Sequence, residues 1–301
     1  MATTRMLSTS HGTNRQAFSG SDWALFVGLS LIWGSSFLLI AIGLDSFDPG
    51  LVTLLRVGFG AIVLSLFPAA RRRTIEPEDR NKLRMLGFVW IALPLTLFPI
   101  AQQWIDSSVA GMLNGATPIF TALLATILLR ALPGRLQLVG LFAGFAGIIA
   151  IALPSAGGGR TAAIGVALVL VATVCYSIAL NVVTPLTQKY GSLPVMAFVL
   201  RVGAILTIPY GLYGATQSSF SWPSMLAMLV LGIVGAGLAF YMMGLFNSSV
   251  GATRSAFITY AIPVVALVLG VVVRNELVAP VAVIGVVLVI VGAFLASRRE
   301  V

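Results

Sequence analysis

Long apolar runs separated by short polar connections fill the chain from residue 22 onward. Each run has the length of a helix that crosses a bilayer, about 20 residues. The runs are longer than a membrane β-strand, about 10 residues, and they do not alternate polar with apolar positions. The pattern therefore predicts an all-α membrane protein with ten transmembrane helices, at residues 22–43, 49–69, 84–104, 107–129, 135–153, 162–184, 193–213, 223–245, 251–272 and 277–297.

The composition supports a membrane environment. Of the 301 residues, 58% are hydrophobic and 9% are charged, and the mean hydropathy is +1.03. So few charges could not cover the surface of a soluble protein of this length. Residues 1–21 are polar and lack the apolar core of a signal peptide, so they are predicted to be a disordered tail. Residues 154–161 are rich in Gly and predict a linker, and residues 298–301 form a second tail.

The basic residues are distributed unevenly between the two sides of the predicted bundle. With the N-terminus in the cytoplasm, 14 Lys and Arg residues fall on the cytoplasmic side and 2, Arg160 and Arg274, fall outside. The positive-inside rule then places both termini in the cytoplasm. The net charge of +9 does not indicate nucleic-acid binding, because no basic face interleaved with aromatic residues is visible.

Catalytic and metal-binding motifs are missing from the sequence. One cysteine, Cys175, and one histidine, His11, permit neither a disulfide within the chain nor a cysteine metal cluster. The sequence has no His-Glu-x-x-His helix and no Gly-x-x-x-x-Gly-Lys loop. We therefore expect no enzyme activity, no cofactor and no metal, and an intramembrane enzyme is the alternative from another class.

The chain repeats itself at an offset of 145 residues. Pro49 matches Pro194, "LRVG" at 55–58 matches "LRVG" at 200–203, and Pro118 matches Pro263. The repeat divides the chain into residues 22–153 and 162–297, with five predicted helices each. Because five is odd, the second half must enter the membrane from the opposite side. Inverted repeats of this kind are typical of secondary transporters, which bind substrate near the midplane between the halves.

Several motifs together resemble those of one transporter family. They are "IWGSSFL" in the first predicted helix, Pro-x6-Arg at the start of the second, a proline in the middle of the fourth and ninth, and Pro-x12-Glu from Pro263 to Glu276. On these motifs residues 22–297 resemble the ten-helix, EamA-type branch of the drug/metabolite transporter superfamily, and they are similar to its aromatic amino-acid exporters. The first half departs from the pattern, because Ala131 stands where Glu276 would be matched. The resemblance implies metabolite export across a bacterial inner membrane.

Two arginines lie inside apolar runs. Arg56 and Arg201 each follow a proline at a helix start by seven residues, which is about 10 Å along a helix. Such a charge should face the protein interior or water. It could contact a substrate carboxylate, or it could bond backbone carbonyls at broken helix ends. Neither arginine is expected at the midplane, so we predict a structural or gating pair. Pro118 and Pro263 could be static kinks or hinges.

Polar and aromatic residues near the middle of the helices are candidates for a substrate cavity, with interhelical hydrogen bonding as the alternative for each. The predicted set is Trp33, Ser36, Gln103, Asn114, Thr117, Tyr176, Tyr241 and Tyr260. Asn181 and Asn247 are further candidates, nearer the helix ends.

The predicted helix interiors contain no carboxylate, which favours uncoupled, facilitated transport over proton coupling. The expected substrate is a zwitterionic amino acid, aromatic or large and apolar; sugars, nucleoside-like metabolites and drugs are alternatives. The lipid bilayer is the other expected partner, and the sequence is compatible with a monomer.

Overall fold

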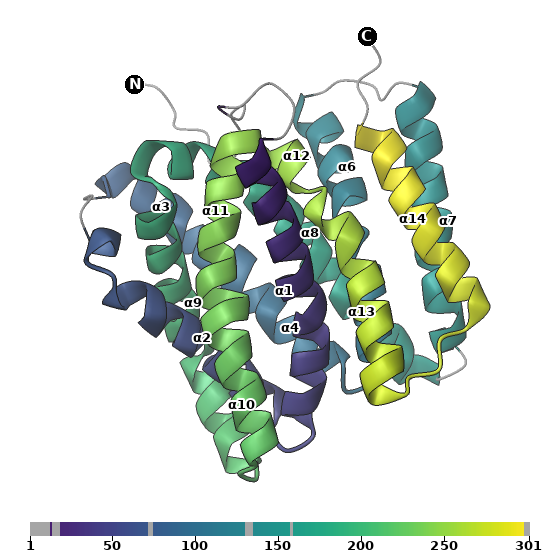
Figure 1. Cartoon of the computed structure of the whole chain (residues 1–301), viewed down its shortest axis with the longest axis horizontal. Helices are drawn as coiled ribbons and strands as arrows, with labels where there is room; N and C mark the ends of the chain where they lie inside the picture. The colour runs from purple at the N-terminus through teal and green to yellow at the C-terminus, as the bar shows by residue number, and fades with distance from the viewer. Residues whose placement is uncertain (1–12, 14–18, 72–74, 130–134, 157–158, 298–301) are drawn as a thin grey trace.

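A computed structural model describes residues 13, 19–71, 75–129, 135–156 and 159–297. These residues form helices and no β-strand elements (Figure 1). The first part of the chain contains α1 (Gly20–Leu44), α2 (Pro49–Leu66), η1 (Pro68–Arg71), α3 (Pro77–Leu86), η2 (Gly87–Ala92), α4 (Leu93–Ala101), α5 (Ser107–Asn114), α6 (Thr117–Leu129) and α7 (Arg135–Ala156). The second contains α8 (Gly159–Tyr190), α9 (Ser192–Thr216), α10 (Trp222–Val230), η3 (Leu231–Leu238), α11 (Ala239–Val250), α12 (Ala252–Ser255), α13 (Ile258–Arg274) and α14 (Pro280–Ser297).

Six helical segments are long and apolar enough to cross a membrane, at Gly20–Leu44, Pro49–Leu66, Pro77–Ala101, Ala162–Tyr190, Ser192–Thr216 and Trp222–Val250. Three shorter apolar helices lie at Leu138–Pro154, Ile258–Arg274 and Pro280–Gly292. The predicted run at 107–129 is broken into α5 and α6. The count of ten helices and the orientation of the termini stay predictions. The first turn of α1 and the last turn of α14 lie at the same end of the bundle (Figure 1).

The predicted linker at 154–161 is largely helical. Helix α7 continues to Ala156, and α8 begins at Gly159, so residues 157–158 alone separate the described helices. The predicted tails, residues 1–21 and 298–301, lie mostly outside the described residues. Within the described part of the first tail, Ser19 caps α1: its side chain accepts from the backbone N–H of Asp22, which orders the start of the helix.

Two long helices contain a π-helical segment at matched positions of the repeat. Segment η2 begins at Gly87 and η3 at Leu231, next to Gly232, the match of Gly87. Segment η2 runs into Pro94, which has no N–H to donate to the carbonyl of Trp90. Segment η3 contains three glycines, at 232, 235 and 237. The backbone widens where regular α-helical bonding is weak, and π segments are frequent at functional sites.

The bundle is held by close packing between matched helices of the two halves. Helix α2 packs on α9, and α7 packs on α14. At the second contact the backbones meet, because a Cβ atom added to Gly147 would lie 2.6 Å from the carbonyl oxygen of Gly285. Small residues permit such approach between membrane helices. The Gly-rich faces of α7 and α14 therefore lie in close contact.

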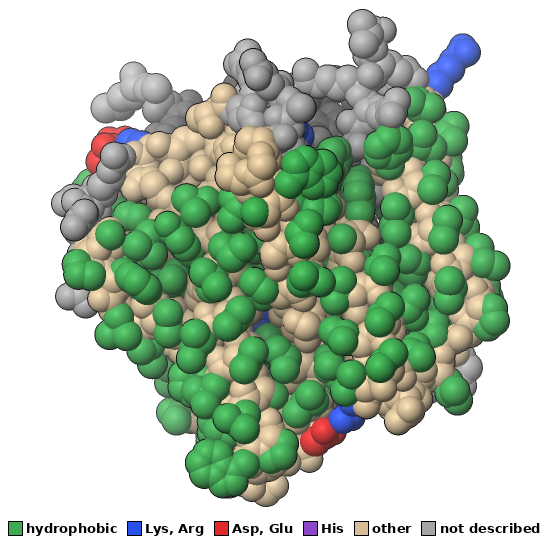
Figure 2. All heavy atoms as spheres, viewed as in Figure 1, with side chains coloured by type: hydrophobic (Ala, Val, Ile, Leu, Met, Phe, Trp, Pro, Cys, Tyr) green, Lys and Arg blue, Asp and Glu red, His purple; other side chains and the backbone are tan. Residues whose placement is uncertain are grey.

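The outer surface matches a lipid environment. Figure 2 shows hydrophobic side chains over the middle of the visible face, with charged side chains near its two ends. Large apolar residues such as Phe142, Ile205 and Val272 are exposed on the surface of the bundle. A soluble monomer rarely exposes contiguous apolar surface on this scale.

Candidate substrate cavity

A cavity lies between the two halves of the chain. Its walls come from α1, α2, η2, α4, α5, α6, α8, α11, α12 and α13.

Aromatic rings form two walls of the cavity. On one wall the ring centroid of Phe98 lies 5.3 Å from that of Phe37 and 5.9 Å from that of Tyr176. On the other wall the ring of Phe240 lies 5.5 Å from Trp33 and 5.2 Å from Trp90. The indole N–H of Trp33 donates to the carbonyl of Gly235 in η3 at 3.1 Å, which fixes the orientation of that ring. Such walls favour flat or bulky apolar groups.

Arg56 places the one positive charge of the lining in this apolar space. Helix α2 starts at Pro49 and is capped by Asp48, whose carboxylate accepts from the N–H of Gly50 at 2.8 Å. Two turns later Arg56 lies on the buried face of α2, with 4% of its surface exposed. Its Nε is buried and has no hydrogen-bond partner among the described residues. Every other lining residue is uncharged.

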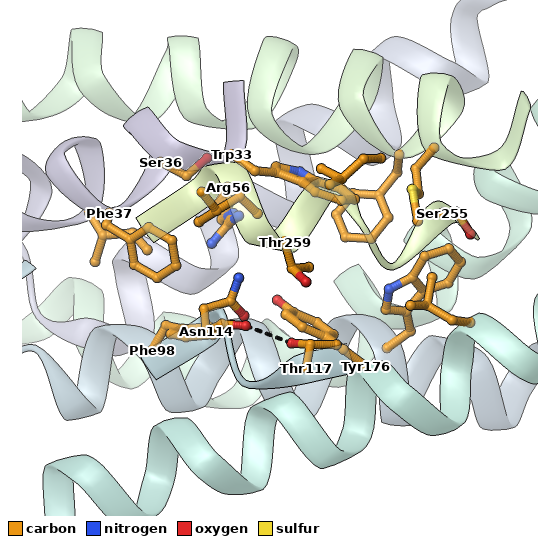
Figure 3. Close-up of a pocket in the computed structure, with 17 residues that line it drawn as sticks. Trp33, Ser36, Phe37, Arg56, Phe98, Asn114, Thr117, Tyr176, Ser255 and Thr259 are labelled. Carbon is orange, nitrogen blue, oxygen red and sulfur yellow. Dashed lines mark hydrogen bonds between the residues drawn. The ribbon is translucent and has the colours of Figure 1, made fainter. Parts of the chain in front are cut away.

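Polar groups from three further helices face Arg56. Figure 3 shows the guanidinium of Arg56, the amide of Asn114 and the hydroxyls of Tyr176 and Thr259 pointing into one space. The side-chain oxygen of Asn114 is buried without a hydrogen-bond partner in the described part of the chain. The hydroxyl of Thr259 donates to the carbonyl of Ala256 at 2.7 Å, so its lone pairs can still accept from a ligand.

The repeat relates Asn114 to Thr259, and Pro118 lies next to the helix break that follows Asn114. Asn114 and Thr259 are themselves matched at the offset of 145 residues, and each precedes a matched proline by four residues. Pro118 cannot donate to the carbonyl of Asn114, and the hydroxyl of Thr117 donates to it instead at 2.8 Å (Figure 3). The chain breaks between α5 and α6 at this point.

The structure brings some of the predicted cavity residues together and leaves others elsewhere. The cavity is lined by Trp33, Ser36, Asn114, Thr117 and Tyr176, whereas Gln103, Tyr241 and Tyr260 are not in its lining. Gln103 is exposed beyond the end of α4. Tyr260 stacks on Phe257 with ring centroids 5.4 Å apart. Whether any lining residue contacts a substrate stays a prediction.

Asn181 and Asn247 form bonds within the protein. The amide of Asn181 donates to the carbonyl of Ser177 at 3.0 Å. Asn247 is fully buried; its oxygen accepts from Thr184 at 2.8 Å and its nitrogen donates to the carbonyl of Leu180. The alternative weighed from the sequence, interhelical hydrogen bonding, thus describes Asn247.

Several lining residues were missed, and helical phase could have found them. Trp33 and Ser36 share a helix face with Phe37 and Ile40, which also line the cavity. Tyr176 shares a face with Leu180 in the same way. Thr259 could have been found as the repeat match of Asn114. At two predicted positions, Tyr241 and Tyr260, the residue just before lines the cavity instead: Phe240 and Thr259.

Arg201 does not share the surroundings of Arg56. It is exposed on α9, along the same face as Ile205, Ile208 and Leu212. Its Nε donates to the carbonyl of Ala197, one turn toward the start of α9, at 3.1 Å. An arginine on a lipid-facing stripe bends toward the nearer interface in this way. The predicted symmetric pair is therefore asymmetric in the structure; the gating role of either arginine is an untested prediction.

Polar contacts join the two halves at one end of the bundle. This end carries Asp45, Asp106 and Glu276 and is called the Glu276 end below. Glu276 accepts from the backbone N–H of Ser107 at 3.1 Å and of Ser108 at 2.9 Å, at the start of α5. Arg274 pairs with Asp45 at 2.7 Å. Partial burial, and then the charge of Glu276, raise the pKa of Asp106 above its usual value. Glu276 is a residue of the connection before α14, as its place after the last helical turn predicts.

A helical bundle with an apolar outer surface and a cavity between its halves has the architecture of a membrane transporter. The chain belongs to the EamA-like transporter family, whose model matches residues 23–153 and again residues 163–298. The resemblance to the drug/metabolite transporter superfamily is thereby confirmed.

Curated relatives carry transporter names. A protein of Streptantibioticus cattleyicolor named "Probable terminal-alkyne amino-acid exporter" is 26% identical over 286 residues, covering 93% of this chain and 94% of the relative. The "Uncharacterized inner membrane transporter YedA" of Escherichia coli K12 is 26% identical over 288 residues, covering 92% of this chain and 93% of the relative. These names describe transporters and not enzymes.

A solved crystal structure, described only as that of a protein, superposes with a TM-score of 0.63 at 20% identity, covering 93% of this chain and 97% of the other. This likeness shows a shared fold alone.

Proposed function

We propose that the protein exports amino acids, with aromatic or large apolar side chains favoured, across a bacterial inner membrane. The observation that carries this proposal is Arg56, which is buried, whose Nε has no hydrogen-bond partner among the described residues, and which is surrounded by aromatic walls. An arginine guanidinium is matched in shape and charge to a carboxylate. The aromatic rings would hold the substrate side chain, and the oxygen of Asn114 would accept from its ammonium group.

The amino-acid class has a second source of support in a relative's name. The Streptantibioticus cattleyicolor protein is named an exporter of a terminal-alkyne amino acid. An alkyne side chain is apolar and linear, and a cavity with the lining described above would accommodate such a group as well as a ring. The identity of 26% transfers this class to the present chain only as a proposal.

Alternating access is the proposed mechanism. The two halves would rock about the cavity, so that one end opens while the other closes. The π segments η2 and η3, the break between α5 and α6 before Pro118, and Pro263 inside α13 would supply points of low helix rigidity in both halves. The lining residues other than Arg56 are uncharged, which supports uncoupled movement down the substrate gradient.

The test is counterflow in liposomes that contain the purified protein. Vesicles loaded with an unlabelled amino acid should accumulate the same radiolabelled amino acid, and phenylalanine, tryptophan and leucine should exceed glycine and lysine. Uptake should persist when the pH inside and outside is equal. Counterflow of no amino acid would remove the substrate class, and strict dependence on a pH gradient would remove the uncoupled mechanism.

A further inference from the structure

The charges that line the cavity indicate which group of an amino acid the site recognises. Arg56 stays protonated at any physiological pH. Its side chain is 4% exposed, and its Nε has no hydrogen-bond partner within the described residues. A buried ion without a partner is costly, and a bound carboxylate offsets that cost through charge-assisted bonds.

The ammonium group of an amino acid finds a weaker site in the same space. The candidate acceptors in the space in front of Arg56 are uncharged: the hydroxyls of Thr259 and Tyr176 point into it, whereas the Asn114 amide turns its nitrogen toward Arg56 (Figure 3). An ammonium group that leaves water needs several good acceptors to replace its hydration. With a zwitterion bound, Arg56 and the ligand together still carry a net positive charge. With a monocarboxylate bound, the pair is neutral.

From these contacts we propose that the cavity selects the carboxylate of its ligand and not the ammonium group. Amphipathic monocarboxylates, with one carboxylate and one aromatic or large apolar group, bind at least as tightly as the amino acids that carry the same side chain. The inference rests on the proposed function, because both use this cavity. It extends the substrate class to des-amino acids, which lack the ammonium group of the corresponding amino acid.

The experiment compares three ligands that share one aromatic ring. Equilibrium binding to the purified full-length protein is measured by isothermal titration with 3-phenylpropionate, L-phenylalanine and 2-phenylethylamine. We expect 3-phenylpropionate to bind with a Kd equal to or below that of phenylalanine, and phenylethylamine to bind at least tenfold more weakly than either. A higher Kd for 3-phenylpropionate than for phenylalanine overturns the inference and leaves the proposed function standing. Binding of none of the three overturns both.

Two variants test the assignment to named residues. Arg56→Gln should weaken binding of 3-phenylpropionate at least tenfold, because the charged donors are lost. Arg201→Gln is the matched control, since Arg201 occupies the same repeat position but is exposed on α9, and it should leave the Kd unchanged. Unchanged binding in Arg56→Gln, or an equal loss in Arg201→Gln, contradicts the assignment.

Asn114→Asp gives an independent result if Arg56→Gln does not fold. The substitution keeps the shape of the side chain and adds a carboxylate opposite Arg56. It should reverse the order of the ligands, so that phenylalanine binds more tightly than 3-phenylpropionate. An unchanged order in a folded Asn114→Asp protein, checked by size-exclusion chromatography, overturns the inference.

Discussion

Tyr176 contributes two separable contacts to the cavity wall. Its ring lies 5.9 Å from that of Phe98, and its hydroxyl points into the space in front of Arg56 (Figure 3). Tyr176→Phe removes the hydroxyl and should weaken ligand binding about fivefold, the value of one hydrogen bond of about 1 kcal/mol. Tyr176→Leu also removes the ring contact and should weaken it further. Titration with phenylalanine measures both steps; equal affinity in all three proteins would exclude Tyr176 from the site.

Thr184 and Asn247 form a polar contact that lies apart from the cavity. Thr184 donates to Asn247 at 2.8 Å between α8 and α11, and both side chains are fully buried. Thr184→Val leaves the oxygen of Asn247 without this donor, which should cost about 1–3 kcal/mol. Thr184→Ser keeps the hydroxyl and is the control. We expect a lower melting temperature for the valine variant only, and the same ligand Kd for both. A changed Kd would show that Asn247 takes part in ligand binding.

At the scale of elements, glycine stabilises the bundle by allowing helices to approach closely, and its backbone flexibility contributes less. Gly147→Ala would place a methyl group 2.6 Å from the carbonyl oxygen of Gly285, so α7 and α14 would have to separate. Such overpacking costs about 1–3 kcal/mol. Gly58→Ala is the matched control, because nothing lies within 4 Å of an added Cβ there. It should stabilise α2 by about 0.5–1 kcal/mol. Thermal unfolding in detergent should shift in opposite directions, and equal shifts would contradict the packing.

The sequence predicts some of these elements and not others, because different physical features determine where each helix begins, ends or breaks. Apolar length locates the helices, and it also joins α5 to α6, because a break of two residues at Gly115 and Ala116 changes the hydropathy little. The prolines at 94 and 118 correctly indicate irregular backbone. They do not predict whether the backbone forms a π segment or a helix break. Helical phase would have added Phe37 and Ile40 to the cavity. The difference between Arg56 and Arg201 could not be predicted, because identical local sequences acquire different neighbours through the packing of α2, α9 and η3.

At the scale of the whole molecule, polar contacts join the halves at both ends of the bundle. At the Glu276 end, Glu276 holds the start of α5, and Arg274 pairs with Asp45. At the other end Lys189 bonds Glu76 at 2.6 Å and Asp79 at 2.9 Å, which ties α8 to α3. A carrier that alternates must break one of these sets while the other holds. The strength of each set therefore biases which end opens.

Removal of the Glu276 contacts should open the end at which they lie. Glu276→Ala leaves the first N–H groups of α5 without their acceptor and frees α5 from the connection after α13. Ile40 lines the cavity on α1, four residues before that helix ends near Asp45. In a Cys175→Ser background, Ile40→Cys should react severalfold faster with a membrane-impermeant maleimide when Glu276→Ala is present. Glu78→Ala, which removes an exposed carboxylate at the start of α3, is the control and should leave the rate unchanged. A rate that does not rise with Glu276→Ala would mean that the hydrophobic contacts between α1 and α13, and not the polar ones, keep this end closed.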